Sequence, residues 1–363
     1  GPRWARHHNH LSSTSAMVSA GGRTFTIVDE GPAASLALPA DWQLVARDAF
    51  NGVVLWKFPI GPWEGRLRPF RSGPVELSRR LVAVGQQVYV TPGYGEPIVA
   101  LDAASGAEVE SYRETKDALE FIVDDNRLFA VVGVIDRDGY EVNLRRGLAS
   151  PTPGNKRLVA IDTRSGKVLW QKSDIATSNL LPSTLCTGKG RLFFHSPHEL
   201  VCLDAATGER RWQASRPLQV ARFSWSSPTL LVHDDVVLSA DRAAATPPNA
   251  SDKKAVIDWN VTAKPNRTGA VGELIAYSAV NGEQLWRCPT AMGYNSPPDV
   301  FVTGGLVWTG AAPGRNSEDF TQGRDLRTGH VKREFETESL FSVAHHHRCY
   351  RNKATERFLS VGR

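Results

Sequence analysis

Histidine and arginine side chains gather in two stretches of this sequence, where they could bind a metal or an anion. The first group is Arg6, His7, His8 and His10, and the second is His345, His347, Arg348 and Cys349. Neutral imidazoles bind Zn, Cu or Ni, and a thiol can add a soft ligand. Protonated imidazoles beside guanidinium groups would instead attract an anion such as carboxylate or sulfate. The residue types therefore indicate a metal site, an anion site, or a polar surface that binds nothing.

The elements that must position these side chains are hairpins, and one hairpin pattern occurs six times. In the copy at residues 158–170, an aliphatic run ends at Asp162, and Gly166 precedes a return strand that reaches Trp170. An Asp side chain can accept backbone N–H groups two or three residues on, and Gly can adopt the positive φ that closes the turn. The other copies are marked by Asp48, Gly52 and Trp56, by Asp102 and Gly106, by Asp204, Gly208 and Trp212, by Gly282 and Trp286, and by Asp325 and Gly329.

A second hairpin precedes each copy of the first, so the repeating unit has four antiparallel strands. The predicted units are 11–60, 78–114, 118–174, 182–216, 227–290 and 299–336, with part of a seventh at 343–363. Short strands separated by frequent turn signals, in units of this size, are typical of β-propeller blades. We therefore predict an all-β fold in which 1–363 is one β-propeller domain, truncated at both ends. The full ring is expected to have seven or eight blades.

Further candidate residues lie in the segments that lead into the first strands of these units. They are Arg79, Arg80, Asn179, Trp225, Tyr294 and Asn295. First strands line the central channel of a propeller, so we expect these side chains and the two histidine groups at the channel mouth. There, the candidate metal ligands are His7, His8, His345, His347 and Cys349. The net charge of +5 favours an anion over a metal.

The pattern Leu-x-Ala-x-Asp-x-x-x-Gly-x-x-x-Trp resembles the pyrroloquinoline-quinone-like (PQQ-like) propeller repeat, over residues 12–363. Quinoprotein alcohol dehydrogenases have this repeat, and so does the non-catalytic propeller lipoprotein of outer-membrane protein assembly. The resemblance implies that Trp56, Trp170, Trp212 and Trp286 pack between adjacent blades and that the Asp–Gly corners lock them. It also implies a periplasmic or exported protein.

Quinone catalysis is tested by the residues that such dehydrogenases use. The resemblance implies an adjacent Cys pair over the quinone, but Cys186, Cys202, Cys288 and Cys349 are all separated in the sequence. No Cys-x-x-Cys-His haem motif occurs either. Because these motif residues are missing, PQQ with calcium is only an alternative cofactor. A disulfide between Cys186 and Cys202 is not expected, because a strand separates them.

The resulting prediction is a non-catalytic binding or scaffold propeller. Its long connections at 30–43, 135–157 and 241–273 would present a face to a protein, a glycan or a small anionic ligand. The alternative is a quinone- or metal-dependent oxidoreductase with its site at the channel mouth. The sequence has no Lys/Arg run with interleaved aromatics and no run of about 20 apolar residues. We therefore expect no nucleic-acid binding and no transmembrane segment, and we expect a monomer.

Overall fold

The computed structural model describes residues 14–31, 41–61, 79–133, 155–218, 227–242, 272–290, 300–309 and 322–334. Within these ranges nearly all regular structure is β-strand. The helical exceptions are η3 (Arg113–Thr115) and α3 (Ile175–Ser178), each less than two turns long. The strands form six four-stranded antiparallel sheets, and each sheet contains four strands that are consecutive in the sequence. We call these sheets blades 1 to 6.

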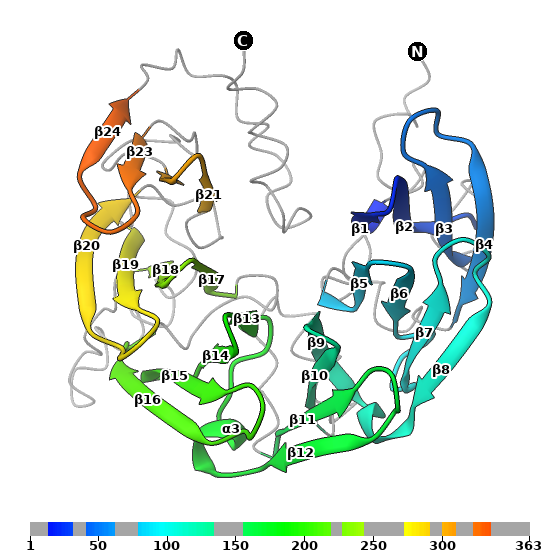
Figure 1. Cartoon of the computed structure of the whole chain (residues 1–363), viewed down its shortest axis with the longest axis horizontal. Coiled ribbons are helices and arrows are strands. Elements are labelled where there is room, and N and C mark those ends of the chain that lie inside the picture. Colours follow the sequence, from blue (N-terminus) through cyan, green and yellow to red (C-terminus); the bar gives the residue numbers. More distant parts are fainter. Residues whose placement is uncertain are drawn as a thin grey trace, which may run out of the picture. The chain divides into compact units, whose positions relative to one another are not determined.

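The chain divides into two compact units of three blades each. The first unit comprises Gly1–Arg145 and Pro151–Ser178, and the second comprises Arg146–Ser150 and Asn179–Arg363. Figure 1 labels their strands in chain order, from blue through green to orange. Each unit is described by itself below.

The first unit contains blades 1 to 3, whose strands pair only with their neighbours in the sequence. Blade 1 is β1 (Thr14–Ala20), β2 (Arg23–Asp29), β3 (Trp42–Asp48) and β4 (Val54–Ile60). Blade 2 is β5 (Leu81–Val84), β6 (Gln87–Val90), β7 (Ile98–Asp102) and β8 (Glu108–Tyr112). Blade 3 is β9 (Ala118–Asp124), β10 (Arg127–Val132), β11 (Arg157–Asp162) and β12 (Val168–Lys172). Adjacent blades approach each other through their first strands, β1 against β5 and β5 against β9.

The second unit contains blades 4 to 6 and has the same strand order. Blade 4 is β13 (Cys186–Gly188), β14 (Arg191–His195), β15 (Glu199–Asp204) and β16 (Arg210–Ser215). Blade 5 is β17 (Thr229–His233), β18 (Val236–Arg242), β19 (Gly272–Ser278) and β20 (Gln284–Thr290). Blade 6 is β21 (Phe301–Thr303), β22 (Leu306–Thr309), β23 (Gln322–Asp325) and β24 (Val331–Glu334). The first strands β13 and β17 lie against each other.

The core of each blade is built by its two middle strands. In β11, Leu158 to Ile161 are all buried, so this strand is covered on both faces and its sequence is a continuous apolar run. In the outer strand β12 most side chains are exposed or only partly buried. Burial of each Leu or Ile in β11 contributes about 1.5–3 kcal/mol, which explains why this strand is a continuous apolar run.

The predicted all-β fold of four-stranded antiparallel repeats is confirmed. The predicted seventh unit at 343–363 lies outside the described residues, so the number of blades in the full ring stays a prediction.

Candidate functional site

The corner between the third and fourth strands has the same glycine-to-carbonyl hydrogen bond in all six described blades, and in five of them an Asp side chain also accepts two turn amides. In blade 1, Asp48 Oδ1 accepts the amides of Phe50 and Asn51 at 2.9 and 3.0 Å. The amide of Gly52 donates to the Asp48 carbonyl at 2.9 Å, and Gly52 has φ +74°. This positive φ is the backbone conformation that favours glycine over other residues. In the fifth copy, Ser278 Oγ accepts the Val280 amide at 3.3 Å in place of the carboxylate.

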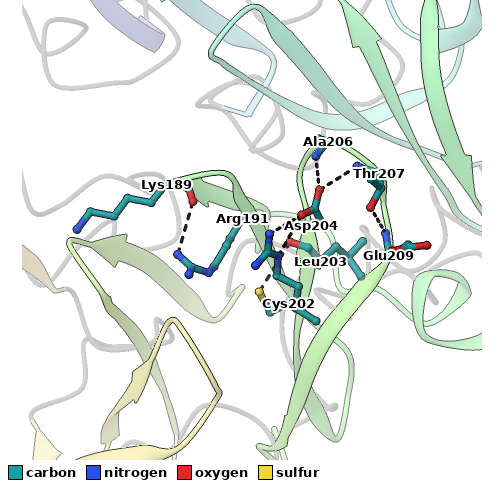
Figure 2. Close-up of polar contacts among 9 residues, drawn as sticks. Lys189, Arg191, Cys202, Leu203, Asp204, Ala206, Thr207 and Glu209 are labelled. Atoms are coloured by element: carbon teal, nitrogen blue, oxygen red, sulfur yellow. Dashed lines mark hydrogen bonds and ion pairs between the residues drawn. The ribbon is translucent and has the colours of Figure 1, made fainter.

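The pKa values of the Asp102, Asp162 and Asp204 carboxylates are lowered, which holds these three groups in their charged form. The Ser105 hydroxyl and amide hold the pKa of Asp102 below its ordinary value, and Ser165 does the same for Asp162. At Asp204 the largest contribution comes from Arg211, which donates from Nη2 at 2.5 Å. Figure 2 shows Asp204 with the amides of Ala206 and Thr207 directed at its carboxylate. The lone pairs of these carboxylates are used to accept the backbone amides that form the turn.

The joint from blade 1 to blade 2 is made by Trp56. Its indole N–H donates to the carbonyl of Ala103 at 3.1 Å, so a tryptophan of one blade bonds the corner of the next. Its ring covers Gly106 so closely that a Cβ there would stand 2.7 Å from Trp56 Cδ2. On its own blade it packs against Phe25, with ring centroids 5.8 Å apart. Gly106 is therefore required both for its φ of +75° and for the space that Trp56 occupies.

The joint from blade 2 to blade 3 reaches the same backbone position by a different side chain. Glu110 stands where the tryptophan would be, and it lies beside Gly166 at 3.5 Å from the position of a Cβ. Two residues later, the Tyr112 hydroxyl donates to the Thr163 carbonyl at 3.1 Å. Tyr112 is buried and stacks on Tyr89 with centroids 6.3 Å apart. Burial raises the pKa of Tyr112, and the nearby Tyr89 raises it further.

The second unit repeats the tryptophan form of this joint. Trp212 Nε1 donates to the Ala279 carbonyl at 3.0 Å, and Trp286 Nε1 donates to the Leu326 carbonyl at 2.9 Å. Cβ atoms on Gly282 and Gly329 would meet the two indole rings at 2.5 and 2.6 Å. Each described tryptophan joint therefore pairs one indole with one glycine corner.

A buried polar cluster also connects blades 4 and 5, away from the corners. Arg216, only 2 % exposed, follows β16 and donates from Nε to Ser239 Oγ of β18 at 3.0 Å. Its Nη1 donates to Glu273 Oε2 of β19 at 2.7 Å. His195 Nε2 of β14 lies 3.0 Å from Ser239 Oγ. Arg287 forms a second ion pair with Glu273.

The Ser239–His195 pair has the spacing of a nucleophile and a base, but its surroundings do not suit catalysis. Both residues have no exposed surface, and Ser239 Oγ also accepts the Arg216 N–H. Ser239 Oγ keeps a second lone pair after accepting the Arg216 N–H, so it can either donate to His195 Nε2 or accept from it, according to the imidazole tautomer. A buried ion pair of this kind is strongly destabilising to break, because it leaves an uncompensated charge. We interpret the cluster as a structural connection between the two blades.

Three of the residues predicted at the channel mouth lie in the described part of the chain. Arg80 is buried, with its guanidinium carbon 6.0 Å from the centre of the Tyr94 ring. Arg79 is partly buried and Asn179 is exposed. The remaining predicted site residues lie outside the described ranges: Arg6, His7, His8, His10, Trp225, Tyr294, Asn295, His345, His347, Arg348 and Cys349. The channel-mouth site therefore stays a prediction.

The described cysteines are free thiols in separate places. Cys186 is partly buried, whereas Cys202 and Cys288 are buried. Burial raises the pKa of Cys202 to about 12, so its thiolate is not available for catalysis at neutral pH. Among the residues with described positions, no three His, Cys, Asp or Glu side chains form a group that could hold a metal. Nor does that part of the chain contain a helix long and apolar enough to cross a membrane.

Sequence reasoning missed Tyr112 and the Arg216 cluster. Arg216 lies in a connection, and its partners come from strands 23 and 57 residues further along the chain. No local sequence pattern therefore indicates them. Tyr112 had one usable signal. A residue able to donate a hydrogen bond follows closely after Glu110, the position that lacks the repeated tryptophan.

Solved structures of several propellers are similar to this chain. BamB from Moraxella catarrhalis is 16% identical, with 87% of this chain and 71% of that chain covered and a TM-score of 0.45. A quinohemoprotein alcohol dehydrogenase from Pseudomonas putida is 14% identical, with 91% and 60% covered and a TM-score of 0.47. A europium-containing methanol dehydrogenase is 11% identical, with 90% and 80% covered and a TM-score of 0.42. No curated protein sequence matches significantly.

A family model matches the chain over a long range of its sequence. Residues 40–262, more than half of the sequence, match the model described as outer membrane protein assembly factor BamB. The matched range includes the corners of blades 1 to 4 and the PQQ-like repeat that marks them. This chain therefore belongs to the BamB family of PQQ-repeat β-propellers.

Proposed function

We propose that this chain is a non-catalytic propeller that binds a protein partner in the periplasm or another exported compartment. The observation that carries the proposal is the family match over residues 40–262, because the description of that family names the assembly of outer membrane proteins. The described polar groups support a binding role over a catalytic one. Corner carboxylates such as Asp48 accept turn amides, and Ser239 and His195 are enclosed within the protein.

The partner is expected to contact surface that the blades do not need for their own packing. From the sequence, we predict that the long connections at 30–43, 135–157 and 241–273 form one binding face. The alternatives to a protein partner are a glycan or a small anion that binds this face. They are tested by titrating the purified chain with such ligands.

The test is purification of the tagged full-length protein from solubilised cell envelopes after chemical crosslinking in the cell. We expect one stoichiometric protein partner that an equally tagged unrelated exported protein does not retain. Isothermal titration of the purified chain with acetate, sulfate and a panel of envelope oligosaccharides covers the alternatives. Binding of one of these ligands with no protein partner would overturn the proposal.

A second measurement tests the non-catalytic part of the proposal. The purified chain is incubated with PQQ, Ca²⁺, a primary alcohol and an electron-accepting dye. We expect no dye reduction above that of heat-denatured protein. Dye reduction that requires both PQQ and Ca²⁺ would assign the chain to the oxidoreductases instead.

A further inference from the structure

The corner of blade 1 is exposed, whereas the corresponding corners of the other five described blades are covered. The residue that follows the corner Asp or Ser is exposed in blade 1, where it is Ala49. Its five equivalents are at most 7 % exposed: Ala103, Thr163, Ala205, Ala279 and Leu326. The corner glycines divide in the same way, because Gly52 is exposed and the other five are buried or partly buried.

The exposed corner has the same backbone geometry as the covered ones. The Ala49 amide donates to the Gly22 carbonyl at 2.9 Å, as the Ala103 amide does within blade 2. Gly52 has φ +74°, and Gly106 has φ +75°. No donor among the described residues reaches the Ala49 carbonyl, and none of their atoms would lie within 4 Å of a Cβ on Gly52. Blade 1 therefore has the acceptor and the glycine surface of a joint, and both are exposed.

The side chains in the other joints show which chemistry fits this corner. Trp56, Trp212 and Trp286 each donate an indole N–H to the equivalent carbonyl, and their rings cover the next corner glycine. Phe50 is 92 % exposed and adds apolar surface between Ala49 and Gly52. A large ring with one N–H donor would bury that surface and satisfy the carbonyl at once. The corner thus fits a tryptophan on an extended strand.

Sequence order points to Trp4 as this tryptophan. In every described joint, the donor precedes the first strand of the blade that it bonds. Tyr112 precedes β9 by six residues, and Trp56 precedes β5 by 25 residues. Trp4 precedes β1 by ten residues, which is within this range. Residues 1–13 lie outside the described ranges, so order and spacing make the assignment.

The connection from Trp4 to β1 is long enough for such a joint. The donor lies on the outer strand of one blade, and the chain then continues into the first strand of the next. It must therefore cross about three strand spacings, or about 15 Å. Ten extended residues span at most about 33–36 Å. The chain can make this crossing with length to spare for a turn.

We propose that Trp4 packs on Gly52 and donates its indole N–H to the Ala49 carbonyl. The segment around Trp4 would then be the outer strand of a blade that neighbours blade 1, and the exposed corner would be closed by the same chain. The proposal does not depend on the proposed protein partner. It implies that this corner is not part of the partner's binding surface.

The test is proteolysis of the folded full chain with trypsin, in which mass spectrometry follows the bond after Arg6. Trypsin must bind the residues before this bond, so Trp4 has to leave the corner before cleavage. Each rate is divided by that of a free peptide with the same residues 1–13. The variants are Trp4→Ala, Gly52→Ala and the double variant. The matched control is Gly85→Ala, because Gly85 also has a positive φ, +59°, and has no atom within 4 Å of a Cβ position.

We expect Trp4→Ala and Gly52→Ala each to speed this cleavage at least tenfold, because each removes the fit between indole and corner. Gly85→Ala should change the rate less than twofold, and the double variant should be within twofold of Trp4→Ala. Cleavage of the parent as fast as the free peptide, or equal effects of Gly52→Ala and Gly85→Ala, would overturn the proposal. Protection that disappears on dilution would place Trp4 on a second copy and also overturn it. Thermal melts check that every variant is folded.

Discussion

Blades 1 and 2 are joined by an indole, and blades 2 and 3 are joined by a phenol. Trp56 covers Gly106 and bonds the Ala103 carbonyl, whereas Tyr112 bonds the equivalent Thr163 carbonyl and leaves Gly166 beside Glu110. The acceptor is the same backbone position in both joints, one residue after the corner Asp. The comparison shows that the repeat preserves the place where the hydrogen bond ends and allows the donor to change. What differs is the area of ring that packs on the glycine corner.

Trp56→Ala is expected to have the largest effect on this comparison. It removes the ring packed on Gly106 and leaves the Ala103 carbonyl without the indole donor. Truncation of a large aromatic side chain costs about 3–5 kcal/mol, and the lower end applies here because Trp56 is only partly buried. Urea unfolding measures the loss. A change of under about 1 kcal/mol, within the range of ordinary surface substitutions, would contradict the packing role.

Gly106→Ala and Gly166→Ala test the two corners directly. Both place a Cβ at positive φ, which costs about 1–2 kcal/mol in each case. Only Gly106→Ala also forces a clash with Trp56, and overpacking adds about 1–3 kcal/mol. We expect Gly106→Ala to be the more destabilising variant in urea unfolding. Equal losses would mean that the indole moves aside freely.

Tyr112→Phe is expected to be milder, because the ring stays and only the hydroxyl is lost. The hydrogen bond to Thr163 contributes about 0.5–1.5 kcal/mol. A tryptophan at position 110 could take over the donor role, so the double variant Glu110→Trp/Tyr112→Phe should recover part of the loss. If the double variant is less stable than Tyr112→Phe alone, the two joints are not interchangeable.

The smallest expected effect is on the pH dependence of stability. Above about pH 10, the Tyr112 joint should lose stability while the Trp56 joint should not. Burial raises the pKa of Tyr112 in the folded chain, so the neutral phenol is favoured there. Its contribution to stability is fully present below the unfolded pKa of about 10 and declines as the pH rises above that value. Urea unfolding between pH 8 and 11 should show a shallower decline for Tyr112→Phe than for the parent. Trp56→Phe should keep the slope of the parent, because an indole does not ionise in this range.

The corners were predictable because their determinants are local. Asp162 and Gly166 lie within one turn, so residue type and spacing are enough to indicate the geometry. The same holds for the buried middle strand at Leu158 to Ile161, whose apolar run indicates a strand covered on both faces. The start of a short first strand is harder to place, because β13 has only three residues and its neighbours are not part of a repeated motif.

The joints between blades could be expected only where the repeat supplied a tryptophan. Tyr112 was not predicted, because its acceptor lies 51 residues away and no spacing rule connects them. The Arg216 cluster was missed for the same reason, since strands from two blades must pack before its partners meet. The histidine groups of the channel-mouth site lie outside the described ranges, so that site stays a prediction from the sequence.

Ala103 and Thr163, which follow the corner Asp in blades 2 and 3, each use their two backbone groups for different blades. The Ala103 amide donates to Gln86 of its own blade at 2.9 Å, while its carbonyl accepts the Trp56 indole of the preceding blade. One blade thus carries an acceptor carbonyl at its corner and a donor side chain on its last strand. A duplicated copy of such a module brings both halves of a joint with it and can attach at either end of a row. This head-to-tail logic gives a physical route by which rows of these modules can lengthen through duplication without redesign of their interfaces.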